Sequence, residues 1–208
     1  NSKKTNSKKN NNAKKKKGKL RKFIDIILIL ILLGIAMIAY VFFSVGKEYR
    51  VSNEDLLLKN QNTEVFDSEG TQIATLSLDE KRKVMKLSEM SEFIPNAFIA
   101  IEDQRFYNHR GIDPKRTIGA AANYVIKRGS SSYGGSTITQ QLVKNMTKDD
   151  ERNWKRKVRE MVRARQIEDL LSKDEIMELY LNLIYVGGNN IHGIALGSDY
   201  YFSKNPKD

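Results

Sequence analysis

The chain of 208 residues contains no cysteine and only three prolines and 13 glycines, and each scarcity excludes a class of protein. Without cysteine there is no disulfide, no thiolate metal site and no thiol nucleophile. So few prolines and glycines exclude a collagen-like chain and a proline-rich linker. Because 40% of the residues are hydrophobic, the chain can build a core and is not disordered throughout.

Acidic residues are absent from the first 22 positions, which carry 11 of the 36 lysines and arginines. Removing them leaves 25 basic and 25 acidic residues, so the net charge of +11 belongs to this tail. A globular nucleic-acid-binding protein should carry its cations on a folded face, and we therefore expect no nucleic acid among the partners. Residues 1–22 have almost nothing to bury, which predicts a disordered tail.

A long apolar run follows the tail. Residues 26–45 contain no charged side chain, and 20 residues at helical rise span about 30 Å, the thickness of a bilayer core. This predicts a transmembrane helix at 23–45. A buried core helix rarely runs so long without a charge, and the apolar region of a cleaved signal peptide is shorter. The lysine-rich flank is then cytoplasmic and the rest of the chain extracytoplasmic in the cell membrane.

The remainder predicts a polar helical stalk at 46–63 and one mainly α domain at 64–208. Alternating apolar and polar residues around 67–70 predict a small β-hairpin near residues 64–78. Ser136 or Thr137 is placed to cap one helix, and Ser172 with Glu175 forms a capping box on another. Periodicity and end signals predict helices at 96–106, 114–128, 138–146, 153–171 and 173–186.

Residues 102–111 offer the first candidate for chemistry. A carboxylate such as Glu102, at the end of an apolar helix, can be partly desolvated, which suits acid–base work. The simpler interpretation is a helix-end acid paired with Arg105. His109 is expected to be a structural hydrogen-bonding residue, because no partner lies at metal-ligand spacing.

Residues 134–145 offer the second candidate for chemistry. Glycines that lead into a helix N-terminus can make an anion site, although this is not a Walker A loop. Gln141, Lys144 and Asn145 lie at i, i+3 and i+4 and should project near one another. The alternative is a capped helix with a polar face.

The third segment is a predicted helix in which residues 152–165 carry seven cations and a single acid, Glu160. Repulsion between cations four residues apart destabilises a helix, so an anion should compensate them. Glu102 and Glu160 would then be two carboxylates in opposite electrostatic settings. The fourth segment, residues 173–187 with 193–202, is predicted to be core. Its Ala195 and Gly197 should allow close packing, with bulk supplied by Tyr200, Tyr201 and Phe202.

Taken in order, these segments resemble the motifs of the peptidoglycan glycosyltransferases, the lysozyme-like family that polymerises lipid II. The matching stretches are 102–111, 134–145, 156–168 and 173–187. The resemblance covers about residues 64–208, and the hairpin is similar to that of class A penicillin-binding proteins. Because the chain starts with Asn and stops soon after a fifth motif, we expect an N-terminal fragment that lacks the transpeptidase domain and the last transferase helices.

Three positions depart from the family pattern. An arginine that the family often carries falls at Gly119, with Arg116 one turn earlier as a substitute. The usual Ala-Ala pair of the fifth motif is Leu196-Gly197, and the preceding glycine loop is one residue longer, with His192 where tyrosine is common.

The resemblance implies that Glu102 is the general base for inverting, β-1,4-forming transfer of a growing chain, linked to polyprenyl pyrophosphate, onto the 4-hydroxyl of lipid II. Glu160 is implied as the second essential carboxylate, which organises cations or holds Mg²⁺ or Mn²⁺. No organic cofactor is implied. The implied substrate and pyrophosphate contacts are Ser136, Thr137, Gln141, Lys144, Asn145, Arg152 and Arg159. The implied supporting residues are Asp103, Phe106, His109, Arg156 and Lys157.

Two other functions stay open at this point. A membrane-anchored lysozyme-like hydrolase would also use two carboxylates, but it needs a protonated acid and no cationic cradle for pyrophosphate. A non-enzymatic anchored protein that binds polyanions would carry diffuse cations and tolerate the loss of single carboxylates. The partners expected of the glycosyltransferase are lipid II, the lipid-linked glycan chain, the membrane and other cell-wall synthesis proteins.

Overall fold

The computed structural model describes residues 2–52, 56, 63–76, 81–127, 134–149, 151, 153–188 and 190–207. The chain divides into two compact units, Asn1–Lys47 and Glu48–Asp208. The first unit is a helix, and the second holds the remaining helices and two small sheets.

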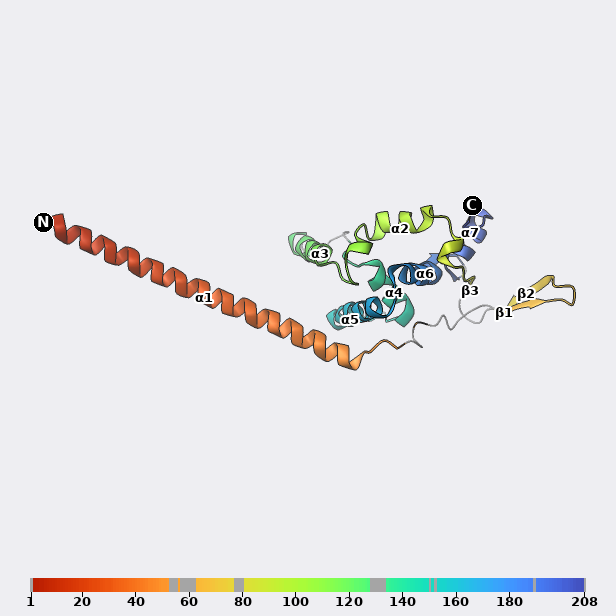
Figure 1. Ribbon diagram of the computed structural model, residues 1–208, viewed down its shortest axis with the longest axis horizontal. Coiled ribbons are helices and arrows are strands. Elements are labelled where there is room, and N and C mark those ends of the chain that lie inside the picture. The colour runs from red at the N-terminus through yellow and green to blue at the C-terminus, as the bar shows by residue number, and fades with distance from the viewer. Residues whose placement is uncertain are drawn as a thin grey trace. The chain divides into compact units, whose positions relative to one another are not determined.

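Helix α1, Ser2–Glu48, is continuous over 47 residues (Figure 1). Its stretch Lys19–Glu48 has a mean hydropathy of 3.1 in its most apolar window, and none of that window is buried inside the structure. By length and composition this stretch can cross a membrane. The helix predicted at 23–45 is therefore present and extends beyond both predicted ends.

The lysine-rich tail differs from expectation. Residues 1–22 were predicted to be disordered, but the helix continues through them from Ser2. Starting a helix is the costly step, whereas adding residues to an existing one is cheap. Lysine is also a good helix former, so the apolar helix can extend into the tail despite the repulsion between its charges.

The predicted stalk is only partly described. Helix α1 ends at Glu48, and Tyr49–Ser52 are not helical, so the expected helical stalk does not form there. Most of 53–62 lies outside the described residues. The predicted hairpin is confirmed: β1 (Thr63–Phe66) pairs antiparallel with β2 (Gln72–Leu76). In its turn the Asp67 carboxylate accepts hydrogen bonds from the backbone N–H groups of Glu69 and Thr71.

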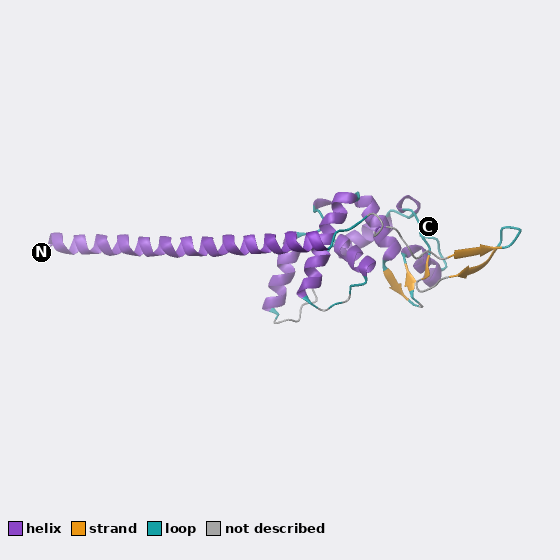
Figure 2. Ribbon diagram, turned by 90° about the horizontal axis from the view of Figure 1, so that it is seen from below, coloured by secondary structure: helices purple, strands orange, loops and turns teal. Residues whose placement is uncertain are grey.

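The rest of the second unit is mainly α, as predicted (Figure 2). Its α-helices are α2 (Phe93–Glu102), α3 (Pro114–Ile126), α4 (Ile138–Thr147), α5 (Trp154–Leu170), α6 (Lys173–Leu183) and α7 (Ile194–Phe202). Two short 3₁₀ turns, η2 and η3, lie at Leu87–Glu89 and Phe106–Asn108. A small sheet absent from the sequence prediction has the order β3 (Lys81–Arg82), β5 (Ile191–His192), β4 (Tyr185–Gly187).

Two helix starts follow the predicted caps. Thr137 caps α4 in a capping box with Gln140, and Ser172 caps α6 in a capping box with Glu175. Asp113 accepts a hydrogen bond from the backbone N–H of Arg116 at 3.1 Å at the start of α3. The helix predicted at 96–106 ends earlier, at Glu102, because the Asp103 carboxylate caps another helix, α4, and the chain turns away there.

The core lies where α4, α5 and α6 pack together. Its fully buried side chains include Ile138, Leu142, Ile167, Ile176, Met177, Tyr180 and Leu181. Figure 1 shows α2 and α3 on one side of α4 and α5 on the other. Helix α4 is therefore the element from which polar side chains can reach both α2 and α5.

Helix α7 confirms half of its prediction. Ala195 and Gly197 are buried, and a Cβ at Gly197 would lie 2.9 Å from Val186 Cγ2. Tyr200, Tyr201 and Phe202 were expected in the core but are exposed at the surface. The side chains of three consecutive residues spread over about 200° around a helix axis, so they cannot all point into the core.

Candidate active site

Glu102, the last residue of α2, is half-buried and faces α4. Its Oε2 accepts a hydrogen bond of 2.7 Å from Gln141 Nε2. The alternative partner considered from the sequence, Arg105, forms an ion pair with Asp113 instead. Among the described residues, Glu102 Oε1 has no hydrogen-bond partner, so one carboxylate oxygen is held and the other is open.

Asp103 and His109 form a buried pair beneath this carboxylate. Asp103 Oδ2 accepts from the backbone N–H of Ile138, the first residue of α4, at 3.0 Å and lies 2.9 Å from His109 Nε2. His109 thus has the structural hydrogen-bonding role expected of it. Phe106 is fully buried, with Lys173 Nζ 4.3 Å from its ring centroid. The loop after Glu102 is therefore fixed to α4 and α6.

Thr137 and Ser136 precede α4 but have different surroundings. Thr137 is fully buried, and its Oγ1 donates to the carbonyl of Gly111 at 2.7 Å while it caps the helix. Thr137 therefore fixes the position of the loop, and none of its surface is exposed to contact a ligand. Ser136 is half-buried and accepts a hydrogen bond of 2.7 Å from Lys157 Nζ. Arg116 donates to the carbonyl of Gly134 at 2.9 Å, which ties this loop to α3.

Glu160 lies buried between two cations of its own helix, α5. Its Oε2 accepts from Arg156 Nη1 at 2.7 Å, and its Oε1 forms an ion pair with Lys157. Only 5% of Glu160 is exposed, so the pairing neutralises a carboxylate that would be costly to bury alone. Through Lys157, Glu160 is connected to Ser136 at the start of α4.

The surroundings of Glu160 do not suit a divalent cation. Mg²⁺ and Mn²⁺ prefer several oxygen ligands, whereas both Glu160 oxygens already accept from cationic groups. In the part of the chain that the structure describes, no three His, Cys, Asp or Glu residues gather as a metal site would need. We derive no step through a metal ion.

Arg159 is held by two acids that precede α5. It contacts Asp149 Oδ2 at 2.7 Å and Glu151 Oε2 at 2.8 Å. Its hydrogen bonds lower the pKa of both carboxyls, and they raise the pKa of Arg159 in return. Arg159 would have to exchange these partners to bind a substrate anion. Arg152, the other arginine predicted to bind, lies outside the described residues.

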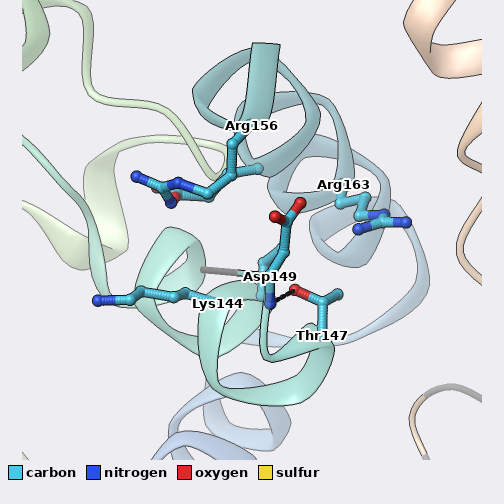
Figure 3. A pocket seen from close by; sticks show the side chains of 7 residues that line it. Lys144, Thr147, Asp149, Arg156 and Arg163 are labelled. Atoms are coloured by element: carbon cyan, nitrogen blue, oxygen red, sulfur yellow. Dashed lines mark hydrogen bonds and ion pairs between the residues drawn. The ribbon is translucent and has the colours of Figure 1, made fainter. Parts of the chain in front are cut away.

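A small pocket opens between α4 and α5, lined by Val143, Lys144, Thr147, Asp149, Arg156, Glu160 and Arg163. Figure 3 shows Lys144 and Arg156 extending to the same side, while Arg163 extends to the other. Lys144 is exposed, and neither its ammonium group nor the Asn145 side chain has a polar partner among the described residues. The pocket therefore presents uncommitted positive charge.

The motifs and this geometry agree with a comparison to known families. A family model described as Transglycosylase matches residues 69–208, more than half of the chain. The chain belongs to the transglycosylase family. This confirms the family resemblance of its motifs.

The chain is similar in sequence to several penicillin-binding proteins. The transglycosylase chain is 38% identical to penicillin-binding protein 1F of Bacillus subtilis over 190 residues and 39% identical to penicillin-binding protein 1A/1B of the same species over 203 residues. It is 42% identical to penicillin-binding protein 1A of Vibrio cholerae over 184 residues. These alignments cover 91%, 97% and 87% of the chain but only 26%, 22% and 22% of the relatives. The chain thus spans about a quarter of their length.

Sequence reasoning about this transglycosylase missed three side chains at the site. Tyr180 contacts Gln141 from a helix that the pattern identified only as core. Arg163 was counted among the cations but not singled out as pocket-lining. Asp149 could have been predicted from the sequence, because acids just before a strongly cationic helix are placed to pair with the cations of its first turns.

Proposed function

We propose that this transglycosylase polymerises lipid II into β-1,4-linked glycan strands for cell-wall peptidoglycan. Glu102 takes the proton from the 4-hydroxyl of the acceptor lipid II. That oxygen forms a bond to the anomeric carbon of the growing chain, with inversion. The bond from this carbon to polyprenyl pyrophosphate breaks, and its electron pair leaves with the pyrophosphate.

The observation that carries the proposal is the contrast between the two carboxylates. Glu102 is half-exposed, contacts a neutral amide and keeps one oxygen open, as a general base requires. Glu160 is buried with both oxygens committed to Arg156 and Lys157, which suits a residue that organises positive charge.

The pyrophosphate leaving group needs positive charge rather than a proton donor. Lys144 supplies it most directly, since it is exposed beside the pocket and unpaired among the described residues, with Arg156 extending to the same side. Ser136, half-buried just before α4, stays a predicted contact. Arg159, and Arg152 outside the described residues, stay predicted contacts.

The membrane side of the proposal rests on exposed apolar residues. Ile118, Tyr124 and Ile126 on α3 are between 60% and 76% exposed and would face the lipid part of the substrate. Helix α1 would anchor the protein in the cell membrane with its N-terminus in the cytoplasm and the second unit outside. Association with other cell-wall synthesis proteins stays a prediction.

The two rival functions fit this site less well. A hydrolase needs a protonated acid beside the scissile bond, but Glu160 is paired with two cations. A protein that only binds polyanions needs free cations, whereas Glu160, Asp149 and Glu151 neutralise much of α5.

The test is polymerisation of labelled lipid II by the protein purified with its membrane helix. Glu102→Gln should reduce the rate by about 10²- to 10⁴-fold, the range for loss of a general base. Glu92→Gln, at the exposed opposite end of α2, is the matched control and should polymerise normally. Failure of the wild type to polymerise, or equal rates for Glu102→Gln and the wild type, would disprove the proposed function.

A further inference from the structure

We propose that Tyr180 is a positioning residue for this reaction: through the amide of Gln141 it fixes the direction in which the Glu102 carboxylate faces. The inference rests on the proposed function of Glu102 as the base. Tyr180 lies within the fourth matching stretch, residues 173–187, which the sequence identified only as core.

Three side chains from three helices form a single line of hydrogen bonds. Tyr180 on α6 directs its hydroxyl to Gln141 Oε1 on α4 at 3.3 Å. Gln141 Nε2 donates to Glu102 Oε2 at the end of α2 at 2.7 Å. Residues far apart in the sequence therefore converge on one carboxylate.

Tyr180 itself has little freedom to move. It is fully buried in the core between α4, α5 and α6, and its ring packs edge-on against Phe98 with centroids 5.7 Å apart. Its hydroxyl is thus a fixed point, whereas Glu102 and Gln141 are only half-buried and have rotatable side chains.

The Tyr180 hydroxyl determines the orientation of the Gln141 side-chain amide. An amide offers oxygen on one side and NH₂ on the other, and a flip exchanges them. A carboxylate can only accept, so Glu102 requires the NH₂ group, and the Tyr180 proton requires the oxygen. Burial, and then the negative charge of Glu102, raises the pKa of Tyr180, so its hydroxyl stays a donor. Only one amide orientation satisfies both neighbours.

The backbone next to Glu102 is tied to the same helix. Asp103 Oδ2 accepts from the N–H of Ile138, about one turn before Gln141 on α4. The side chains of Glu102 and Asp103 are thus both hydrogen-bonded to α4. With Oε2 held by Gln141, Oε1 is the oxygen that faces the substrate proton, and proton transfer depends on that direction.

A double-mutant cycle tests the inference on lipid II polymerisation. Tyr180→Phe keeps the ring and its packing but removes the hydroxyl, and we expect kcat to fall about tenfold with little change in KM. Gln141→Ala should lower kcat at least as much. In the Gln141→Ala background, adding Tyr180→Phe should have no further effect, because Tyr180 acts only through the amide. Tyr200→Phe, at an exposed tyrosine of α7, is the matched control and should leave kcat unchanged.

The outcomes separate this inference from the proposed function. If the wild type and Tyr200→Phe polymerise lipid II but Tyr180→Phe has wild-type kcat, the inference is wrong. It is equally wrong if the effects of the two substitutions multiply, since a purely structural tyrosine would act independently of Gln141. Inactivity of the wild type would instead disprove the proposed function.

A second measurement does not depend on activity. In a crystal structure of Tyr180→Phe we expect Glu102 or the Gln141 amide to take a new or a second conformation. In one of Tyr200→Phe we expect neither to change. A single, unchanged Gln141–Glu102 contact in the Tyr180→Phe structure would overturn the inference.

Discussion

Gly111 shows how one residue joins the loop after Glu102 to two helices. Its φ is +80°, a conformation that other residues rarely adopt, and a Cβ there would lie 2.6 Å from the Ala164 carbonyl oxygen on α5. Its own carbonyl accepts from the Thr137 hydroxyl that caps α4. The close approach to α5 and the cap of α4 thus both depend on the absence of a side chain at Gly111.

Gly111→Ala should destabilise the protein by about 3 kcal/mol, because backbone strain of about 1 kcal/mol adds to an overlap with fixed backbone atoms. Gly70→Ala is the matched control, since Gly70 has φ +84° but no atom within 4 Å of its Cβ position. It should cost about 1 kcal/mol. Denaturant unfolding in detergent micelles, followed by fluorescence of the single tryptophan, Trp154, measures both. Equal losses for the two variants would contradict the role given to the contact with α5.

Helix α5 shows which anions compensate its cations, as the sequence led us to expect. Carboxylates of the protein itself neutralise many of these cations. Glu160 pairs with Arg156 and Lys157, Asp149 and Glu151 hold Arg159, and Asp169 pairs with Arg165. A ring contact adds to these, because the Arg159 and Arg163 guanidinium groups lie 5.5 and 5.2 Å from the ring centroid of Tyr49.

The acids of this element should differ in what they contribute to stability. Glu160→Gln removes a buried charge from between two cations and should cost about 3 kcal/mol in unfolding free energy. Glu151→Gln, the same chemical change at a 57% exposed side chain, should cost clearly less, because solvent screens its ion pair. Denaturant titrations at low and high salt give both values, and salt should weaken only the Glu151 contribution. Similar losses for both variants would show that burial does not matter to the Glu160 pairing.

At the scale of the whole molecule, the distribution of charge and apolar length predicts an orientation in the membrane. The excess of cations lies in residues 1–22, before the uncharged run 26–45, and the remainder of the chain is balanced. Under the positive-inside rule this distribution predicts a cytoplasmic tail and an extracytoplasmic unit with Glu102. The proposed function requires this orientation.

The absence of cysteine makes this orientation directly measurable, because a single introduced cysteine has no background. In intact cells, Ser88→Cys, at an exposed position of the second unit, should react with a membrane-impermeant maleimide. Ser7→Cys in the tail should react only after the cells are lysed. The reverse labelling pattern would invert the topology and refute the proposed location of the site.

Much of the local structure could be predicted from the sequence. The apolar run, the hairpin turn at Asp67, and the caps at Thr137 and Ser172 were all read correctly. The candidate residues around Glu102 and Glu160 were also identified beforehand. These features depend on hydrophobic periodicity or on hydrogen bonds between residues a few positions apart, which a linear sequence displays directly.

Only the tertiary structure decided how those residues are used. It ends α2 at Glu102 because Asp103 is drawn to the N-terminus of α4, and it joins Lys81–Arg82 to Ile191–His192 in a sheet. It also brings Tyr180 against Gln141. Each of these depends on hydrogen bonds between groups at least 35 positions apart. Such bonds form only once the packing of the core has removed the competing water and fixed both partners, so no local pattern in the sequence could reveal them.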